Sequence, residues 1–292
     1  MTRRIWLISK SRCKWSKPKC WLVGRYALPQ PRRRNPRTSP MQIESIWQYP
    51  IKGVGGNSIS RTTLTVEKPM LGDRRYAISA GSLKAIQADD GVWLQKAHFL
   101  QLMQTESLAA LRCWLDDEII AIQSVGNDSF EGNLAIPDDR ARCQRFIANF
   151  LQLPDPAILR IHQIDNGAFT DQAEPLISIG GSASLAAFAA ATHTPNDARR
   201  FRLNIMVATT TAFAENQWVG SKFQIGEAVV EITANVGRCA AINVEPESAI
   251  RKSDHLATMR QSFGHTYLGV FGRVITPGTV QRGDSFIALS SN

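Results

Sequence analysis

Long hydrophobic runs are missing from this sequence of 292 residues. No stretch of about 18 uninterrupted apolar residues occurs, so the sequence predicts no membrane-spanning helix. Its five cysteines are odd in number, and none forms a CxxC pair. This usage argues against a zinc ribbon or a disulfide framework and favours a reducing compartment. We therefore expect a cytoplasmic protein.

Acidic residues are absent from the first 40 positions, which carry 12 of the 34 lysines and arginines. The rest of the chain holds 22 basic and 25 acidic residues and is slightly acidic. A basic footprint confined to a Pro/Arg-rich leader argues against nucleic acid as a partner. We expect residues 1–40 to be disordered. They are either an over-extended start ahead of Met41 or an organelle-targeting peptide, which would change the expected location.

Complete nucleotide-binding and hydrolase motifs are also lacking. The turn at 52–56 contains three glycines, but Ser58 stands where a GxGxxG pattern needs another glycine. Its glycines permit positive φ and expose backbone N–H groups beside Lys52, which makes the turn a candidate anion cradle. A glycine-rich hairpin with a solvated lysine is the alternative.

Short strand-like segments separated by turn residues make up most of the remaining sequence. They predict a mainly β (α+β) fold with short helices and a closed barrel in the second half. A loop after residue 164 separates an expected antiparallel β-rich unit, 41–165, from a second domain, 166–292. Pro137-Asp138-Asp139 predicts the start of a helix whose buried side includes Cys143. Cys113 lies among leucines and is also expected in the core.

Two further segments carry candidate ligand-binding residues. A strand ends at Gly180-Gly181 and an alanine-rich helix follows, so Ser182 or Ser184 is expected to cap the helix and could help to bind phosphate. An ordinary helix cap is the alternative. Residues 199–207 are predicted to form a strand, which would place Arg202 and Asn204 on the same side of it. Such a pair suits a polyanionic ligand or a solvated strand face.

One cysteine differs from the others in its setting. An alternating apolar run ends at Asn235-Val236-Gly237 and is followed by Arg238 and Cys239. This pattern displays a thiol at a break between regular segments, and the adjacent guanidinium favours the thiolate that redox-active metals bind. A small buried hydrophobe is the alternative for Cys239.

Five motifs, taken in order, resemble the MOSC proteins, and more narrowly those with a MOSC N-terminal β-barrel domain, such as the mitochondrial amidoxime-reducing component and its bacterial relatives. The resemblance covers residues 41–292. The motifs are Tyr-Pro-Ile-Lys at 49–52, Gly-Asp-Arg-Arg-Tyr at 72–76, Arg-Phe-Arg-Leu-Asn-Ile at 200–205, Gly-Arg-Cys at 237–239, and Phe-Gly-Arg-Val with Pro-Gly and Arg-Gly-Asp ending at 284.

This resemblance implies a molybdenum cofactor, in which a phosphate-bearing pterin dithiolene holds the metal. It makes Cys239 the catalytic cysteine and the protein ligand of the metal. The resemblance implies that basic residues hold the phosphate and the pterin, namely Lys52, Arg74 and Arg202. Arg238 would lie beside the thiol. Asn204 and the Ser182/Ser184 turn would help to bind the cofactor. The sequence departs from the family at Leu203, where relatives have proline.

The expected activity is that of a molybdenum-dependent oxidoreductase that reduces small N-hydroxylated compounds. Electrons are expected from a separate ferredoxin-type or flavoprotein-type partner. The alternative is a carrier of molybdenum cofactor or sulfur in which Cys239 bears a persulfide. A nucleic-acid-binding protein that uses the basic leader is a third and weaker alternative.

Overall fold

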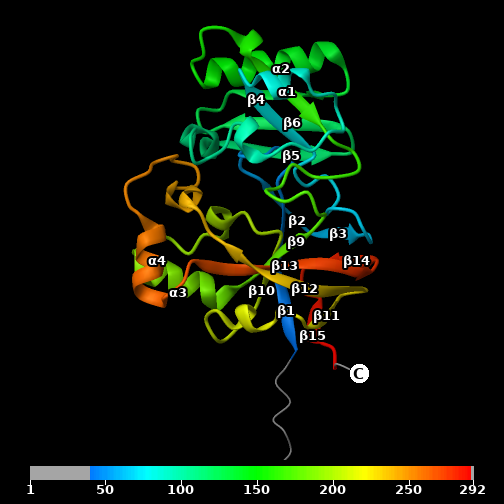
Figure 1. Cartoon of the computed structure of the whole chain (residues 1–292), viewed down its shortest axis with the longest axis vertical. Coiled ribbons are helices and arrows are strands. Elements are labelled where there is room, and N and C mark those ends of the chain that lie inside the picture. Colours follow the sequence, from blue (N-terminus) through cyan, green and yellow to red (C-terminus); the bar gives the residue numbers. More distant parts are fainter. Residues whose placement is uncertain (1–39, 291–292) are drawn as a thin grey trace, which may run out of the picture. The chain divides into compact units, whose positions relative to one another are not determined.

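A seven-stranded β-barrel forms the C-terminal part of the structure, a computed structural model that describes residues 40–290. The expected leader therefore lies outside the described residues, apart from Pro40. The barrel strands, in pairing order, are β10 (Ile205–Val207), β9 (Ile177–Gly181), β13 (Tyr267–Thr276), β12 (Ala228–Gly237), β11 (Lys222–Ile225), β15 (Ser285–Ala288) and β1 (Met41–Gln48). Strand β1 also pairs with β10, and this pairing closes the barrel (Figure 1).

Alternation along the strands produces the barrel interior. In β12, Ala228, Val230 and Ile232 are fully buried, and the residues between them are more exposed. In β1, Ile43 and Ile46 both belong to this core, because the register shifts between Ile43 and Ser45 and interrupts the alternation. Successive side chains of a strand point to opposite faces, so this pattern places the aliphatic residues inside. The barrel expected from the sequence is confirmed.

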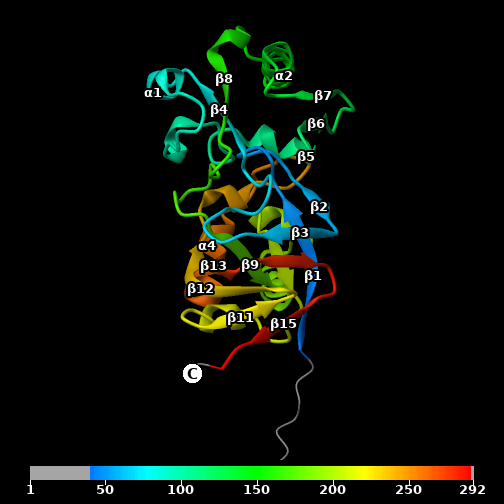
Figure 2. The same ribbon diagram turned by 90° about the vertical axis from the view of Figure 1, so that its right-hand side faces the viewer.

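The part of the chain between β1 and β9 forms smaller sheets (Figure 2). Strands β5 (Leu111–Asp116), β6 (Ile119–Ser124) and β7 (Ser129–Asn133) form one antiparallel sheet, and β4 (Tyr76–Ala80) pairs with β8 (Leu159–Gln163). Strand β2 (Asn57–Ile59) pairs with β1 in the antiparallel direction, and β3 (Arg61–Leu64) pairs with β14 (Gly278–Gln281). The sheets thus connect the two sides of the division expected near residue 165, because β1 and β3 pair with strands from the C-terminal half. That division remains a prediction.

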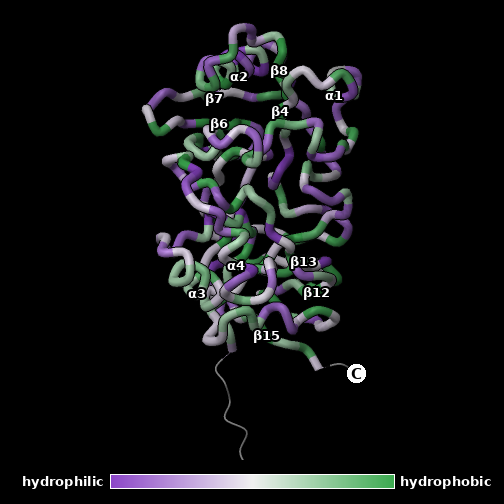
Figure 3. The backbone as a smooth tube through the Cα atoms, turned by 60° about the vertical axis from the view of Figure 1, so that its left-hand side comes forward, coloured by the Kyte–Doolittle hydropathy of each residue, from purple (hydrophilic) through white to green (hydrophobic). Residues whose placement is uncertain are grey.

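Within residues 40–290, four α-helices accompany these sheets: α1 (Leu83–Gln87), α2 (Pro137–Phe150), α3 (Ser182–Thr192) and α4 (His255–Phe263). Helix α2 begins at Pro137, as predicted, and buries Cys143 and Ile147. Hydrophobic stretches lie around β6 and β8 as well as around β12 and α3 (Figure 3). The expected mainly β fold with short helices is therefore confirmed. Within residues 40–290, no helix has the length and apolar character needed to cross a membrane.

Candidate functional site

A cavity of about 330 Å³ is lined by loops from both halves of the described chain. Its cationic lining residues are Lys52, Arg74, Lys96, Arg200, Arg202 and Arg238, whereas Asp171 is its only carboxylate. Cys239 lines the same cavity. The cavity therefore combines one thiol with a strong excess of positive charge.

Cys239 lies where β12 gives way to a 3₁₀ turn, Ala240–Asn243. Its carbonyl oxygen accepts the Ile242 N–H at 3.1 Å, which fixes the turn, and its side chain stays partly exposed. The other two described cysteines are fully buried, and burial raises the pKa of Cys143 to about 12. The buried-hydrophobe interpretation thus fits Cys113 and Cys143, while Cys239 is open to the cavity.

The backbone conformation that places Arg202 at the cavity differs from the one predicted from the sequence. Residues Ala198–Phe201 form a 3₁₀ turn, and Arg202 ends it in the left-handed region with φ 53°. The strand predicted for residues 199–207 is therefore wrong before Ile205, because this turn reverses the chain. The guanidinium donates hydrogen bonds to the carbonyl oxygens of Val54 and, at 3.5 Å, Ile51. Burial and repulsion from Arg74 lower the pKa of Arg202 to about 10.

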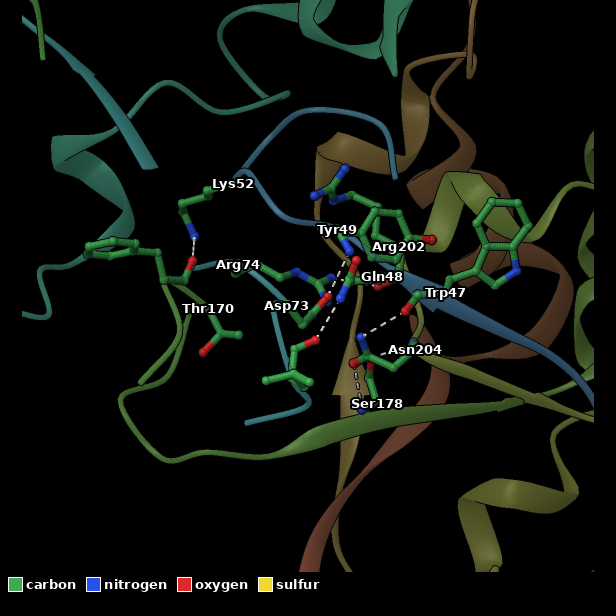
Figure 4. A network of polar contacts seen from close by, with 12 residues as sticks. Trp47, Gln48, Tyr49, Lys52, Asp73, Arg74, Thr170, Ser178, Arg202 and Asn204 are labelled. Atoms are coloured by element: carbon green, nitrogen blue, oxygen red, sulfur yellow. Dashed lines mark hydrogen bonds and ion pairs between the residues drawn. The ribbon is translucent and has the colours of Figure 1, made fainter. Parts of the chain in front are cut away.

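Arg74 follows Asp73 in a turn that also places it in the left-handed region, with φ 48°. Its backbone N–H donates to the Tyr49 carbonyl at 2.7 Å. The guanidinium pairs with the Asp73 carboxylate and donates to the Arg202 carbonyl oxygen at 2.7 Å (Figure 4). Since left-handed backbone costs free energy in residues other than glycine, the fold tolerates strain at two arginines of one cavity.

Lys52 is nearly buried, and its Nζ donates to the Phe169 carbonyl and to Asp171 Oδ1, both at 2.9 Å. Burial lowers the pKa of Lys52, and the Asp171 carboxylate opposes this change. Gly53 follows with φ 81°, and a Cβ there would lie 3.2 Å from the Leu100 carbonyl oxygen. The glycine-rich turn therefore brings Lys52 to the cavity by close backbone packing.

Arg238 supports the cavity wall beside the thiol. Its guanidinium donates to the carbonyl oxygens of Leu268 and Phe201, each at 2.8 Å. Burial lowers the pKa of Arg238 to about 9, although the neighbouring Cys239 opposes this change. Among the described residues, no carboxylate hydrogen-bonds Arg238 or Arg202, so neither guanidinium has a directly paired counterion.

Asn204 lines the cavity, but its side chain mainly ties strands together. Its Oδ1 accepts from the Ser178 N–H at 3.1 Å and from the Ser178 hydroxyl at 2.8 Å, and its Nδ2 donates to the Trp47 carbonyl at 3.3 Å (Figure 4). These bonds connect β9 to the end of β1. The structure thus places Asn204 at the cavity with most of its hydrogen-bonding capacity already used.

The serine turn at the start of α3 lies elsewhere. Ser182 lines a separate surface hollow, and its hydroxyl accepts the Thr209 N–H at 3.1 Å. Ser184 is fully buried and donates to Glu215 Oε2 at 2.7 Å. Gly181, not a serine, occupies the N-cap position. The structure does not bring Ser182 and Ser184 to the cavity, because both side chains are engaged by the segment after β10.

Two cavity residues were missed from the sequence. Asp171 bridges Lys52 and Lys96, with Lys96 Nζ donating to its Oδ2 at 3.0 Å. Asp171 belongs to an irregular segment that the sequence analysis treated as a linker, and Lys96 lies in a short 3₁₀ turn. No local pattern marks either residue, since their meeting depends on how the two halves pack.

Fold and site together define a mainly β protein. One cavity of this protein contains a partly exposed thiol and two guanidinium groups that lack a hydrogen-bonded carboxylate. The chain belongs to the MOSC family. The MOSC N-terminal beta barrel domain matches residues 40–155, and the MOSC domain matches residues 166–286. This family is associated with the molybdenum cofactor.

Similarities to solved structures are remote. The YUAD protein from Bacillus subtilis is 12% identical, with a TM-score of 0.42 and coverage of 86% of this chain and 97% of that one. YiiM from Geobacillus stearothermophilus is 18% identical (TM-score 0.32, coverage 39% and 54%), and YiiM from Escherichia coli is 19% identical (TM-score 0.31, coverage 40% and 55%). This chain thus covers little more than half of either YiiM protein. No curated protein matches the sequence.

Proposed function

We propose that this chain holds a molybdenum cofactor through Cys239 and reduces small N-hydroxylated compounds with electrons from a separate donor protein. One observation carries the proposal: a partly exposed thiol lines the same cavity as Arg202 and Arg238, and neither guanidinium has a hydrogen-bonded carboxylate among the described residues. A buried or half-buried cation without a carboxylate partner favours an anionic ligand.

The donor set fits a metal that arrives with ligands of its own. Among residues 40–290, no group of three or more His, Cys, Asp or Glu side chains is arranged to hold a metal ion. A single thiolate supplies one soft ligand only. A pterin dithiolene would supply further sulfur ligands, and its phosphate would supply the negative charge that the cavity favours.

The residues of the cavity have distinct roles in this proposal. Lys52, Arg74 and Arg202 bind the phosphate and the pterin, because fixed N–H donors and positive charge suit both groups. Arg238 adds positive charge to the wall of the cavity beside Cys239. When bound, the cofactor supplies a redox-active metal that cycles between states differing by two electrons.

The overall reaction replaces an N–OH group by N–H and releases water, which consumes two electrons and two protons. The expected donor is a ferredoxin-type or flavoprotein-type protein. A cytoplasmic location and the lack of a nucleic-acid partner belong to the same proposal.

The test measures molybdenum and pterin content, together with reduction of benzamidoxime by a chemical electron donor. The unsubstituted chain is expected to contain both components and to produce benzamidine. Cys239→Ala should lose the reduction and most of the molybdenum, whereas Cys143→Ala should keep both if it folds. Full activity and molybdenum content in Cys239→Ala would refute the proposal. Sulfane sulfur on Cys239 without molybdenum would favour the carrier alternative instead.

A further inference from the structure

Tyr49 lies beneath the two arginines that have left-handed backbone, at the junction between β1 and the Lys52 turn. Its side chain is almost completely buried. The guanidinium carbons of Arg74 and Arg202 lie over its ring, 4.6 and 4.4 Å from the ring centroid (Figure 4). One aromatic ring therefore contacts two of the cavity's cations.

These two cations are costly to hold together. Arg74 donates to the backbone carbonyl of Arg202, so the two side chains are neighbours, and like charges at short range repel. Both residues also have left-handed backbone. Only Arg74 has a carboxylate partner, Asp73, among the described residues. Arg202 is held instead by the carbonyl oxygens of Val54 and Ile51 and by its contact with the Tyr49 ring.

A ring and a carboxylate offer different kinds of support. The face of an aromatic ring attracts a guanidinium through its quadrupole. A carboxylate attracts it more strongly but cancels its charge and competes with an anionic ligand. The Tyr49 ring holds Arg202 while its full positive charge remains available to the cavity.

The hydroxyl group contributes nothing to this contact. Tyr49 Oη is buried and has no hydrogen-bond partner among the described residues. Burial raises the pKa of Tyr49 to about 12, so the phenol stays neutral near pH 7. The backbone is engaged separately, because the Tyr49 N–H donates to Asp73 Oδ1 at 2.9 Å and its carbonyl accepts the Arg74 N–H. Side-chain substitutions leave these backbone bonds available.

We infer that Tyr49 is a positioning residue whose aromatic ring aligns Arg74 and Arg202 for a phosphate-type anion. The inference rests on the proposed anion-binding role of the cavity, but it requires no molybdenum. It assigns the effect to the ring and not to the hydroxyl.

The test uses the full chain produced in a host unable to make molybdenum cofactor, titrated with inorganic pyrophosphate by calorimetry at pH 7.5 and low salt. Tyr49→Phe keeps the ring and should change the affinity by less than about twofold. Tyr49→Leu removes both cation–π contacts and should weaken binding by about tenfold or more. Rescue by phenylalanine separates the ring's effect from that of the hydroxyl.

Tyr76→Leu is the matched control. Tyr76 is also buried with an unpartnered hydroxyl, but the guanidinium over its ring, at 5.6 Å, belongs to Arg75, which does not line the cavity. We expect Tyr76→Leu to lose stability and keep pyrophosphate affinity. If circular dichroism shows Tyr49→Leu to be unfolded, Tyr49→Met, whose flexible unbranched side chain adapts to the space left by the ring, replaces it.

Three results would overturn the inference: unchanged affinity in the leucine or methionine variant, an equal loss in Tyr49→Phe, or an equal loss in Tyr76→Leu. Absence of pyrophosphate binding in the unsubstituted chain would overturn it as well. The molybdenum content of the unsubstituted chain, made in a cofactor-producing host, decides the proposed function independently. If the chain contains no molybdenum but the variants show the expected pyrophosphate affinities, the role of Tyr49 stands and the proposed molybdenum-dependent function is refuted.

Discussion

Arginines at the cavity and arginines on the outer surface have different partners. Arg75 pairs with Glu118 and Asp165, and Arg140 pairs with Asp90. Arg202 and Arg238 instead donate to backbone carbonyl oxygens. A carbonyl satisfies the N–H groups without supplying a full negative charge. The outer arginines are therefore neutralised locally. Of the cavity arginines, Arg74 and Arg200 pair with Asp73 and Glu245, whereas Arg202 and Arg238 have no paired carboxylate among the described residues and keep the charge that an anionic ligand needs.

The largest effect is expected when one of the two cavity arginines without a paired carboxylate is replaced. Arg202→Gln should weaken pyrophosphate binding by about 10- to 100-fold, since a hydrogen bond to a charged group contributes about 1.5–3 kcal/mol. Calorimetry on the cofactor-free chain measures the change. Arg140→Gln is the surface control and should bind as the unsubstituted chain does. Equal affinities in the two variants would contradict the contrast.

A pH series sharpens the same contrast. The pKa of Arg238 is lowered to about 9 and that of Arg202 to about 10, so both are charged at pH 7. As pH rises through these values, the free protein loses the protons that an anion favours, and affinity should fall by up to about tenfold per pH unit for each group. The pKa of Arg75 is raised, and its charge persists.

Sulfate is a suitable probe for this series because its charge is constant over the range. A Cys239→Ala background removes the thiol, so that only the arginines are compared. In that background, Arg238→Gln should lose the decline near pH 9. A flat profile up to pH 11 in the parent would show that the cavity arginines titrate like ordinary ones.

Replacing Glu215 tests whether this buried carboxylate stabilises the segment that Arg238 contacts. It is fully buried and accepts from the Ser184 hydroxyl at 2.7 Å and from the Gly269 N–H at 3.3 Å, next to the Leu268 carbonyl that Arg238 contacts. Glu215→Gln replaces one acceptor by an NH₂ group and should lower the free energy of unfolding by about 1–3 kcal/mol. Urea denaturation measures this loss. Unchanged stability would show that the buried carboxylate is dispensable.

The smallest effect is expected outside the cavity. Arg75→Gln removes two partly exposed ion pairs, with Glu118 and Asp165, and each such pair contributes about 0–1 kcal/mol. Urea denaturation should show a change of that size, and pyrophosphate affinity should not change. A large loss of affinity in Arg75→Gln would mean that surface charge, and not the cavity, attracts the anion.

Much of the site was accessible from the sequence. The residue pattern pointed to Cys239, Lys52, Arg202 and Arg238, and the family resemblance added Arg74. The structure brings all five to one cavity. Glycines, a displayed thiol and basic residues leave local signals. Their predicted roles toward a cofactor remain predictions.

The errors share a physical cause. The start of α3 has the composition of an anion-binding turn, but local sequence does not say which way Ser182 and Ser184 face. Arg202 was assigned to a strand because nothing in the sequence marks its left-handed backbone. Asp171 and Lys96 meet only after the two halves pack together. The barrel was predicted, whereas the contribution of β1 to it depends on long-range pairing.

The most direct test of the central claim is the molybdenum-to-protein ratio of three chains purified side by side from a cofactor-producing host: the unsubstituted chain, Arg202→Gln and Arg75→Gln. The account predicts a ratio near one for the unsubstituted chain and Arg75→Gln, and a strongly reduced ratio for Arg202→Gln. Equal ratios in all three, or no molybdenum in any of them, would contradict it.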